Sequence, residues 1–427
     1  MPHQPTMPIA DVQPAPAALF RLDSGPMPLH TPVKHGIEQL AAFGGPALWD
    51  TPISTSNLVR PDIEVFLAYS RIFHAQHRYT NDGPLVKQLE KRLAALHRTK
   101  HCIATSNGFW ALVMAMKCLA LPGRSEVVMP SLTYRRLADI VAWVGLVPHF
   151  CEVDEQSLAI SPAAAARCMN ERTALLLGVH PIVNTCDAPG LERVAREHGV
   201  PLLFDAVESV YETIGGRKVG SFGAAECFSL HASKLVNGFE GGYITTDDDA
   251  LARRLSTMRG FGFFGPDNTE GLGINAKLNE MHAAMTLAGL DDLEAQVQRN
   301  RRRYRAYQQE LATVQGLRLL PFDETEQTSY KTVVVELTED WPLSRAQTLE
   351  ILNREGALAR AYYWPALHRK PTRYPTIAPA LPLTQQLAER FMLLPCGHRV
   401  DEHDIAELAE LLRFIAREAH AIQRRSA

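Results

Sequence analysis

The sequence predicts an α/β fold with a mostly parallel central sheet, and three observations support this prediction. Seven short apolar runs lie between residues 101 and 247, and helical patterns separate most of them. Such mostly apolar runs are typical of strands that are buried on both faces of a sheet. The chain also has 427 residues, which is enough for a large core and a second, smaller domain.

The elements of the large domain follow one another regularly from residue 84. Leucines at 85, 89, 93 and 96 recur at helical spacing behind Pro84, which stands at a favourable first-turn position. Seven strands are predicted at residues 101–105, 126–130, 147–154, 173–180, 200–205, 226–231 and 242–247. The last two are joined by a short turn instead of a helix, which allows one of them to be antiparallel.

The remainder of the chain predicts a long helix and then a small α+β domain. The helical pattern covers residues 276–313, and its basic run at 299–305 is interpreted as a solvated face. Strands are expected at 330–337 and 357–363, and helices at 344–356 and from about 401. The predicted division is a flexible tail (1–30), a large domain (31–275), a linking helix (276–316) and a small domain (317–427).

Composition and charge exclude several classes of function. The net charge is −3, with 44 basic and 47 acidic residues, so neither nucleic-acid binding nor a polybasic membrane patch is expected. Seven dispersed cysteines without a CxxC pair indicate free thiols in a reducing compartment, and no apolar run is long enough to span a membrane. The first residues lack the pattern of a secretory signal, so a cytoplasmic protein is expected. The 16 histidines show no metal-ligand spacing.

One lysine stands in an unusual place. Lys234 lies on the turn between the last two predicted strands, whereas lysine is usually a surface residue. Asp205 ends the strand 200–205, and ligands of α/β sheets bind beyond such carboxyl ends. Asp205 could equally cap the following helix, and the turn Ser106–Gly108 could be an ordinary tight turn as well as an anion site. A lysine, a carboxylate and an anion site together are what pyridoxal phosphate requires.

Seven motifs in order carry a resemblance to a known family. They are RYTNDGPLVKQLE (78–90), ATSNGFWAL (104–112), PSLTYRR (130–136), FDAVES (204–209), FSLHASK (228–234), GINAKLNEMHAAM (273–285) and YYWPALH (362–368). On these motifs the chain resembles the DegT-type sugar aminotransferases, a branch of the fold-type I pyridoxal-phosphate enzymes, over about residues 40–420. The resemblance implies a fold-type I architecture with a mostly parallel seven-stranded sheet, and a homodimer with shared active sites.

The resemblance also implies roles for individual residues. Lys234 would carry the Schiff base with pyridoxal 5'-phosphate and shuttle protons, and Asp205 would pair with the pyridine nitrogen. Tyr134 would stack on the cofactor ring. Ser229 and the backbone at Gly108 and Phe109 would hold the phosphate. Asn275 would reach the same phosphate from the partner subunit.

Two residues depart from the family pattern. Glu208 stands where the family has Gln or His near the ring hydroxyl of the cofactor. An ionised carboxylate would repel a phenolate oxygen, so Glu208 is expected to be protonated, turned away or paired with a cation. Phe109 replaces the usual Thr, so one hydroxyl contact to the phosphate is lost.

The sequence also offers candidates for the substrate pocket and for the substrate. Five residues are candidates for the substrate pocket, and each could instead be structural: His180, Asn184, His231, Tyr363 and His368. The resemblance implies transfer of an amino group from L-glutamate or glutamine to a keto sugar. The segment HASKLVNGFEGG lacks the Tyr-Pro and Asn-Leu-Gly-Ala features of the family's 3-aminotransferases, which favours C4 of a nucleotide-linked 4-keto-6-deoxyhexose. An aminocyclitol or other ketone, a lyase or dehydratase activity, and a non-catalytic regulatory role are the alternatives.

Overall fold

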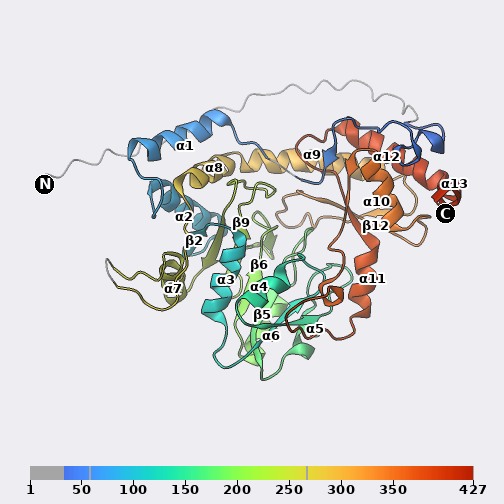
Figure 1. Ribbon diagram of the computed structural model, residues 1–427. Helices are drawn as coiled ribbons and strands as arrows, with labels where there is room; N and C mark the ends of the chain where they lie inside the picture. The colour runs from blue at the N-terminus through green and yellow to red at the C-terminus, as the bar shows by residue number, and fades with distance from the viewer. Residues whose placement is uncertain (1–32, 57–58, 266–267, 427) are drawn as a thin grey trace. The chain divides into compact units, whose positions relative to one another are not determined.

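The computed structural model describes residues 33–56, 59–265 and 268–426 (Figure 1). The predicted flexible tail at 1–30 lies outside the described residues. No helix in the described ranges is long and apolar enough to cross a membrane.

A seven-stranded sheet forms the centre of the fold, as the sequence predicts. Its strands are β2 (His101–Thr105), β3 (Glu126–Pro130), β4 (Val147–Cys151), β5 (Thr173–Val179), β6 (Leu202–Asp205), β9 (Ala225–Ser229) and β10 (Gly242–Thr246). They lie in the order β2-β10-β9-β6-β5-β3-β4. β10 runs antiparallel to both of its neighbours, and the other adjacent pairs are parallel. The expected antiparallel strand is therefore β10.

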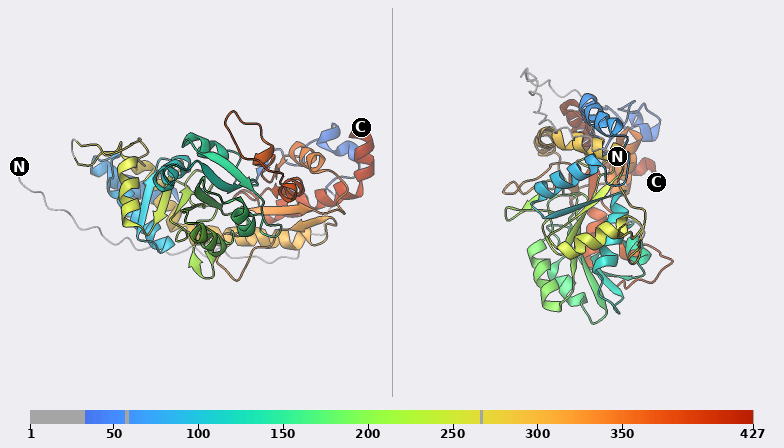
Figure 2. Two further views of the ribbon diagram at one scale, coloured as in Figure 1. Left: turned by 90° about the horizontal axis from the view of Figure 1, so that it is seen from below. Right: turned by 90° about the vertical axis from the view of Figure 1, so that its left-hand side faces the viewer.

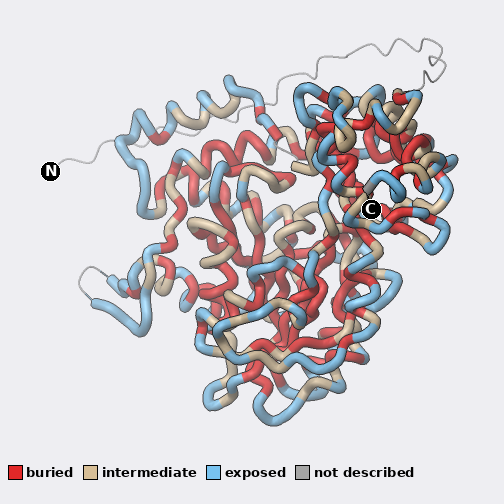
Figure 3. The backbone as a smooth tube through the Cα atoms, turned by 45° about the vertical axis from the view of Figure 1, so that its right-hand side comes forward, coloured by how far each residue is buried: buried red, intermediate tan, exposed pale blue. Residues whose placement is uncertain are grey.

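Helices cover both faces of this sheet (Figures 1 and 2). One face packs against α3 (Gly108–Leu119), α4 (Leu137–Trp143) and α7 (Asp249–Arg259). The other face packs against α2 (Pro84–His97), α5 (Pro162–Cys168), α6 (Ala188–His198) and α8 (Glu280–Asp291). In β5, Leu175 and Leu177 pack on the first face and Leu176 on the second, because successive side chains of a strand point to opposite sides. Most residues of these strands are accordingly buried (Figure 3).

The helical stretch predicted as one helix from residue 276 is two helices. α8 begins only at Glu280, because Asn279 caps it by accepting a hydrogen bond from the His282 amide at 3.0 Å. α8 ends at Asp291, and α9 (Leu293–Leu311) starts again after Asp292. α9 packs against α12 (Glu402–Arg417) and β11 (Leu317–Leu319).

A second, four-stranded sheet lies in the C-terminal part of the chain. It is antiparallel and has the order β11-β12-β15-β14, with β12 (Val333–Leu337), β15 (Phe391–Leu394) and β14 (Arg360–Ala361). The predicted strand at 330–337 starts at residue 333, and the strand predicted at 357–363 is split into β13 (Ala357–Leu358) and β14. α10 (Arg345–Arg354), α12 and α13 (Ala419–Ser426) correspond to the predicted helices. The predicted domain boundaries at 275 and 316 remain predictions.

Several elements were not predicted from the sequence. They are α1 (Ile63–Ala75), α11 (Pro382–Arg390), β1 (Ile53–Ser54), β7 (Thr213–Ile214), β8 (Arg217–Lys218), β11, β15 and the short 3-10 helices at Ile37–Gln39, Ala41–Phe43 and Leu367–Arg369. β1 pairs with β13 in parallel, which ties the start of the described chain to its C-terminal part.

Candidate active site

The last residue of β6 places a carboxylate at the carboxyl edge of the large sheet. Asp205 is only 2% exposed, and its Oδ1 accepts a hydrogen bond from the Val207 amide at 3.2 Å. Burial raises the pKa of this carboxyl group to about 6, although the Val207 amide and the positive charge of Lys234 act in the opposite direction. Asp205 is therefore a buried acid whose ionised form gains from a nearby cation.

Lys234 lies on the loop between β9 and β10, close to this carboxylate. The loop is fixed by backbone hydrogen bonds at both ends: the Leu230 amide donates to Gly241, and the Gly238 amide donates to Leu230, each at 2.8 Å. The Lys234 amide donates to the His231 carbonyl, also at 2.8 Å. A lysine on a loop held in this way is kept in one place at the sheet edge, with 17% of its side chain exposed.

Glu208 holds two lysines at once. Its Oε1 accepts a hydrogen bond from Lys234 Nζ, and its Oε2 accepts one from Lys331 Nζ. Burial would raise the pKa of Glu208, but the two ammonium groups overcome this effect and lower the pKa to about 2. Of the three expectations for Glu208, the structure shows pairing with a cation.

Lys331 is the residue that sequence reasoning missed at this site. It precedes β12, is 9% exposed and lies 123 positions from Glu208 in the chain. A single lysine near the start of a predicted strand (330–337) gives no signal of a buried ion pair. The departure at Glu208 was the available clue, because a buried carboxylate requires a cationic partner.

The turn from β2 into α3 presents backbone donors. Asn107 caps α3 by accepting a hydrogen bond from the Trp110 amide at 2.9 Å, and neither the Gly108 nor the Phe109 amide has a partner among the described hydrogen bonds. Ser229 at the end of β9 lies beside this turn, since a Cβ on Gly108 would lie 3.1 Å from its Cβ. These donors at a helix N-terminus suit a phosphate group.

Phe109 and Tyr134, two residues predicted to contact the cofactor, lie near this edge of the sheet, and their predicted roles remain predictions. Phe109 packs edge-on against the rings of Trp110 and Trp143, so only its backbone is offered to an anion. Tyr134 follows β3 and is 48% exposed, which leaves its ring surface available for stacking.

Asn275 does not join the cluster within one chain. It is exposed on the segment between α7 and α8, and it forms a bridge with Gly260. No contact among the described residues links it to Lys234, Asp205 or Ser229. Its predicted role, in the site of a partner subunit, remains a prediction.

Tyr363 lies near the cluster, whereas His368 is bonded to the residue that follows β3. Burial raises the pKa of Tyr363, and the negative charges of Glu208 and Asp205 add to this effect, so its hydroxyl is neutral and close to both carboxylates. His368 Nδ1 lies 2.7 Å from Ser131 Oγ, at the end of β3, and its Nε2 is buried without a partner in the described residues.

The other three substrate candidates have contacts that favour structural roles. His180 is 2% exposed and is held between Glu226 and Cys186, and these two groups raise its pKa to about 10 against the effect of burial. Asn184 uses both ends of its amide to bind Pro321 and Asp323. His231 is exposed and bonded to Ser233 at 2.8 Å. Their predicted substrate contacts find no support in this geometry.

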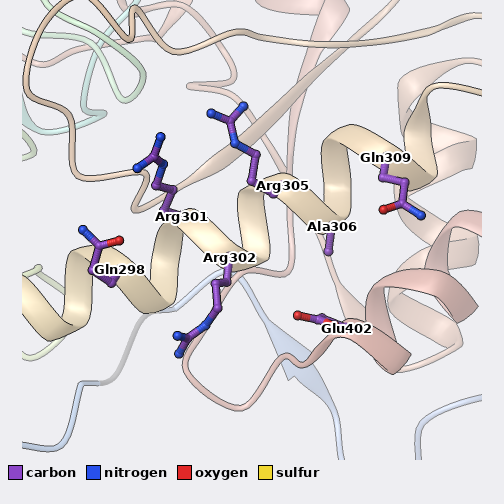
Figure 4. Close-up of a pocket in the computed structure, with 7 residues that line it drawn as sticks. All are labelled: Gln298, Arg301, Arg302, Arg305, Ala306, Gln309 and Glu402. Atoms are coloured by element: carbon purple, nitrogen blue, oxygen red, sulfur yellow. The ribbon is translucent and has the colours of Figure 1, made fainter. Parts of the chain in front are cut away.

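Two surface pockets occur away from this cluster. One of about 350 Å³ is lined by Gln298, Arg301, Arg302, Arg305, Ala306, Gln309 and Glu402 (Figure 4). Arg301 and Arg302 are exposed there, as expected for a solvated face, whereas Arg303 on the opposite side of α9 is buried. The second, of about 230 Å³, includes Asn184 and Glu212. Neither contains Lys234 or Asp205.

The residues at the sheet edge fit pyridoxal phosphate. A buried carboxylate that gains from a cation, a fixed lysine amine and a turn with free amide donors meet at one edge of the sheet. These groups match the ring nitrogen, the aldehyde and the phosphate of the cofactor.

Comparison with known proteins gives consistent matches. The model of the DegT/DnrJ/EryC1/StrS aminotransferase family matches residues 64–413. The UDP-N-acetyl-3-dehydro-alpha-D-glucosamine 3-aminotransferase of Acidithiobacillus ferrooxidans is 30% identical over 329 residues, which cover 77% of this chain and 87% of that protein. The dTDP-4-amino-4,6-dideoxy-D-glucose transaminase of Escherichia coli is 23% identical over 366 residues, covering 84% and 97%.

A solved structure is similar over nearly the whole chain. DesI, crystallised in the presence of its TDP-sugar product, superimposes with a TM-score of 0.85 and 36% identity. The match covers 92% of this chain and 100% of DesI.

Proposed function

The chain belongs to the DegT/DnrJ/EryC1/StrS aminotransferase family, and from this premise we propose that it moves an amino group from L-glutamate or glutamine to the ketone of a nucleotide-linked sugar. The predicted family, the fold-type I architecture and the pyridoxal-phosphate-dependent aminotransferase activity are confirmed by the comparisons. The amino donor, the sugar and the residue roles below belong to the proposal.

The position of Lys234 beside Asp205 at the carboxyl edge of the sheet carries the proposal. Pyridoxal phosphate, when bound, supplies a carbonyl that condenses with amines and a ring that accepts electrons released at Cα. Lys234 Nζ is the amine that would hold this carbonyl, and once the donor has displaced it, it would take the proton from Cα of the donor and deliver it to the carbonyl-derived carbon of the cofactor. Its loop is held by hydrogen bonds at both ends, so the amine returns to the same place.

Asp205 would hold the cofactor by pairing with its ring nitrogen, and its carboxylate would favour a proton there. Its carboxylate is buried, and a cation beside it offsets the cost that burial imposes on its charge. The amides of Gly108 and Phe109 and the hydroxyl of Ser229 orient the phosphate. These residues would hold the cofactor through its ring nitrogen and its phosphate.

The substrate class is supported by the likeness to DesI, which binds a TDP-sugar product. The Escherichia coli relative is a 4-amino-sugar transaminase and the Acidithiobacillus relative is a 3-aminotransferase. The lysine segment of this chain lacks the features of the 3-aminotransferases. We therefore assign the ketone to C4 of a nucleotide-linked 4-keto-6-deoxyhexose.

A single-turnover screen tests this assignment. The protein is converted to its aminated form with L-glutamate or glutamine, freed of donor, and mixed with one ketone at a time. We expect dTDP-4-keto-6-deoxyglucose to restore the absorbance of the starting form faster than UDP-N-acetyl-3-dehydro-alpha-D-glucosamine or 2-deoxy-scyllo-inosose. A faster reaction with either of the last two would move the assignment to C3 or to an aminocyclitol.

A cytoplasmic location belongs to the same proposal. The seven cysteines carry free thiols in the structure. Dispersed free thiols suit a reducing compartment, where this chemistry would take place.

A further inference from the structure

Glu208 is shared by two lysines that come from distant parts of the chain. Lys234 reaches Oε1 from the β9–β10 loop, and Lys331 reaches Oε2 from the segment before β12. The side chains of Lys331 and Glu208 are only 10% and 16% exposed, so the pair is poorly screened by water. One carboxylate therefore faces two ammonium groups in a largely buried place.

We propose that Lys331 is a positioning residue: it is the permanent counter-ion of Glu208, so that Lys234 can give up its proton without leaving a buried carboxylate unpaired. This inference rests on the proposed function in one respect, namely that Lys234 reacts as an uncharged amine. It assigns a task to a lysine that the motifs did not include.

The charges at the site explain why a second lysine is needed. When Lys234 is uncharged, the negative charge of Glu208 is still balanced by the positive charge of Lys331. Without Lys331, the only contacting cation would be Lys234, and its neutral form would leave Glu208 as an isolated buried anion, which is strongly unfavourable. Glu208 would then hold the proton on Lys234.

The other groups around Glu208 cannot replace Lys331. Asp205 on β6 is acidic, and Tyr362, Tyr363 and Cys396 have pKa values that burial raises, so all three are neutral. Arg303 acts on Cys396, and no ion pair links it to Glu208 in the described part of the chain. Lys331 is the one described cation that remains in contact with Glu208 when Lys234 reacts.

The inference also accounts for the departure from the family pattern at position 208. The resemblance places Gln or His there, and a neutral Gln requires no counter-ion. In this chain the acid at 208 and the base at 331 form a compensated pair. Removal of both charges should therefore be tolerated better than removal of Lys331 alone.

The test measures how Lys234 reacts in the protein freed of cofactor. Wild type, Lys331→Met, Lys331→Arg, Glu208→Gln and the double variant Glu208→Gln/Lys331→Met are treated briefly with acetic anhydride at a series of pH values. The acetylation of Lys234 is then measured by peptide mass spectrometry. Lys218→Met is the matched control, because Lys218 is similarly buried but bonds the Tyr211 carbonyl and Gln327 instead of a carboxylate.

We expect Lys331→Met to move the midpoint of acetylation upward by about one pH unit, which is roughly a tenfold loss of labelling below the midpoint. Lys331→Arg and Lys218→Met should follow wild type, and the double variant should follow Glu208→Gln. A Lys331→Met profile that superimposes on wild type, or a double variant displaced as far as Lys331→Met, would overturn the inference. If Lys331→Met fails to fold, the double variant should fold; failure of both would count against the pair.

The result is independent of whether the proposed activity is correct. The acetylation profile needs neither cofactor nor substrate. If wild type holds no cofactor at Lys234 while Lys331→Met still shifts the profile, the proposed function fails and the counter-ion role stands. If wild type is active and the profiles of wild type and Lys331→Met coincide, the proposed function stands and the counter-ion role fails.

Discussion

The position of Asp205 in the fold disfavours the ionised form of its carboxyl group. The end of β6 buries its carboxyl group, and burial raises the pKa from the ordinary 3.8 to about 6. In the protein freed of cofactor, the folded state therefore binds this proton more tightly than the unfolded state. Its contribution favours folding at low pH and is lost as the pH rises through 6.

The substitution Asp205→Asn should therefore stabilise the cofactor-free protein above pH 6. At pH 8 the ionised carboxylate costs about 2–3 kcal/mol, since each pKa unit corresponds to roughly 1.4 kcal/mol. We expect the Tm of the variant to exceed that of wild type by roughly 3 °C at pH 8, and the difference to shrink toward pH 4.5. Calorimetry at both pH values checks this; a difference that does not depend on pH would contradict it.

Lys234 can be identified chemically. Wild type incubated with pyridoxal phosphate and then reduced with borohydride should gain a stable pyridoxyl label on the peptide that contains Lys234. Lys234→Ala should lose the label, and Lys87→Ala, which removes an exposed lysine of α2, should keep it. Mass spectrometry reads the result, and equal labelling of Lys234→Ala would show that another lysine reacts.

Sequence reasoning located these two residues but not their neighbour. Asp205 ends a predicted strand and Lys234 follows one, and the carboxyl ends of the strands of an α/β sheet meet at one edge. Lys331 lies outside that sheet, and its contact with Glu208 depends on how the chain returns after α9. A local sequence pattern does not predict a contact between residues so far apart in the chain.

At the scale of elements, β10 shapes the turn that is offered to the phosphate. Gly242 begins β10 and lies directly against Asn107 and Gly108. A Cβ at Gly242 would lie 2.5 Å from the Asn107 carbonyl carbon and 2.6 Å from the Gly108 nitrogen. These atoms belong to the backbone, so the turn itself would have to move.

Gly242→Ala should therefore weaken both the fold and the binding of cofactor. Overpacking of this kind typically costs about 1–3 kcal/mol. We expect a lower Tm for the cofactor-free protein and a higher Kd for pyridoxal phosphate, measured by calorimetry and by fluorescence titration. Gly260→Ala is the control, because its Cβ would have no neighbour closer than 3.8 Å. Equal behaviour of the two variants would refute the argument.

The strength of the periodic pattern decides which elements can be predicted. The seven strands of the large sheet are predictable because each is a compact apolar run, and helical segments separate most of them. β11 and β15 have three and four residues and give little pattern of their own. The break between α8 and α9 escapes prediction because Asp292, where α8 ends and α9 starts, interrupts no apolar spacing.

At the scale of the whole molecule, Asn275 is the predicted site residue that has no contact with Lys234, Asp205 or Ser229 among the described residues of one chain. We propose that it completes the phosphate site of a partner subunit in a homodimer. Lys234→Ala and Asn275→Ala chains are mixed under conditions of subunit exchange. A mixed dimer has one site with both changes and one with neither, so activity should rise above that of either parent. Activity no higher than the parents' would indicate sites built from one chain.

The place of β10 in the sheet has a consequence for how the chain folds. β2 pairs in this sheet with β10, whose Gly242 faces Thr105 about 140 residues away in the chain. Contacts of such separation form late, since the intervening chain must first be ordered. During synthesis β2 therefore remains unpaired in this sheet until β10, which ends at residue 246, has left the ribosome. The turn at Asn107 and Gly108 takes its shape in the same step, so the cofactor can stabilise the chain only after β10 has paired with β2, and it cannot guide the stages of folding before that.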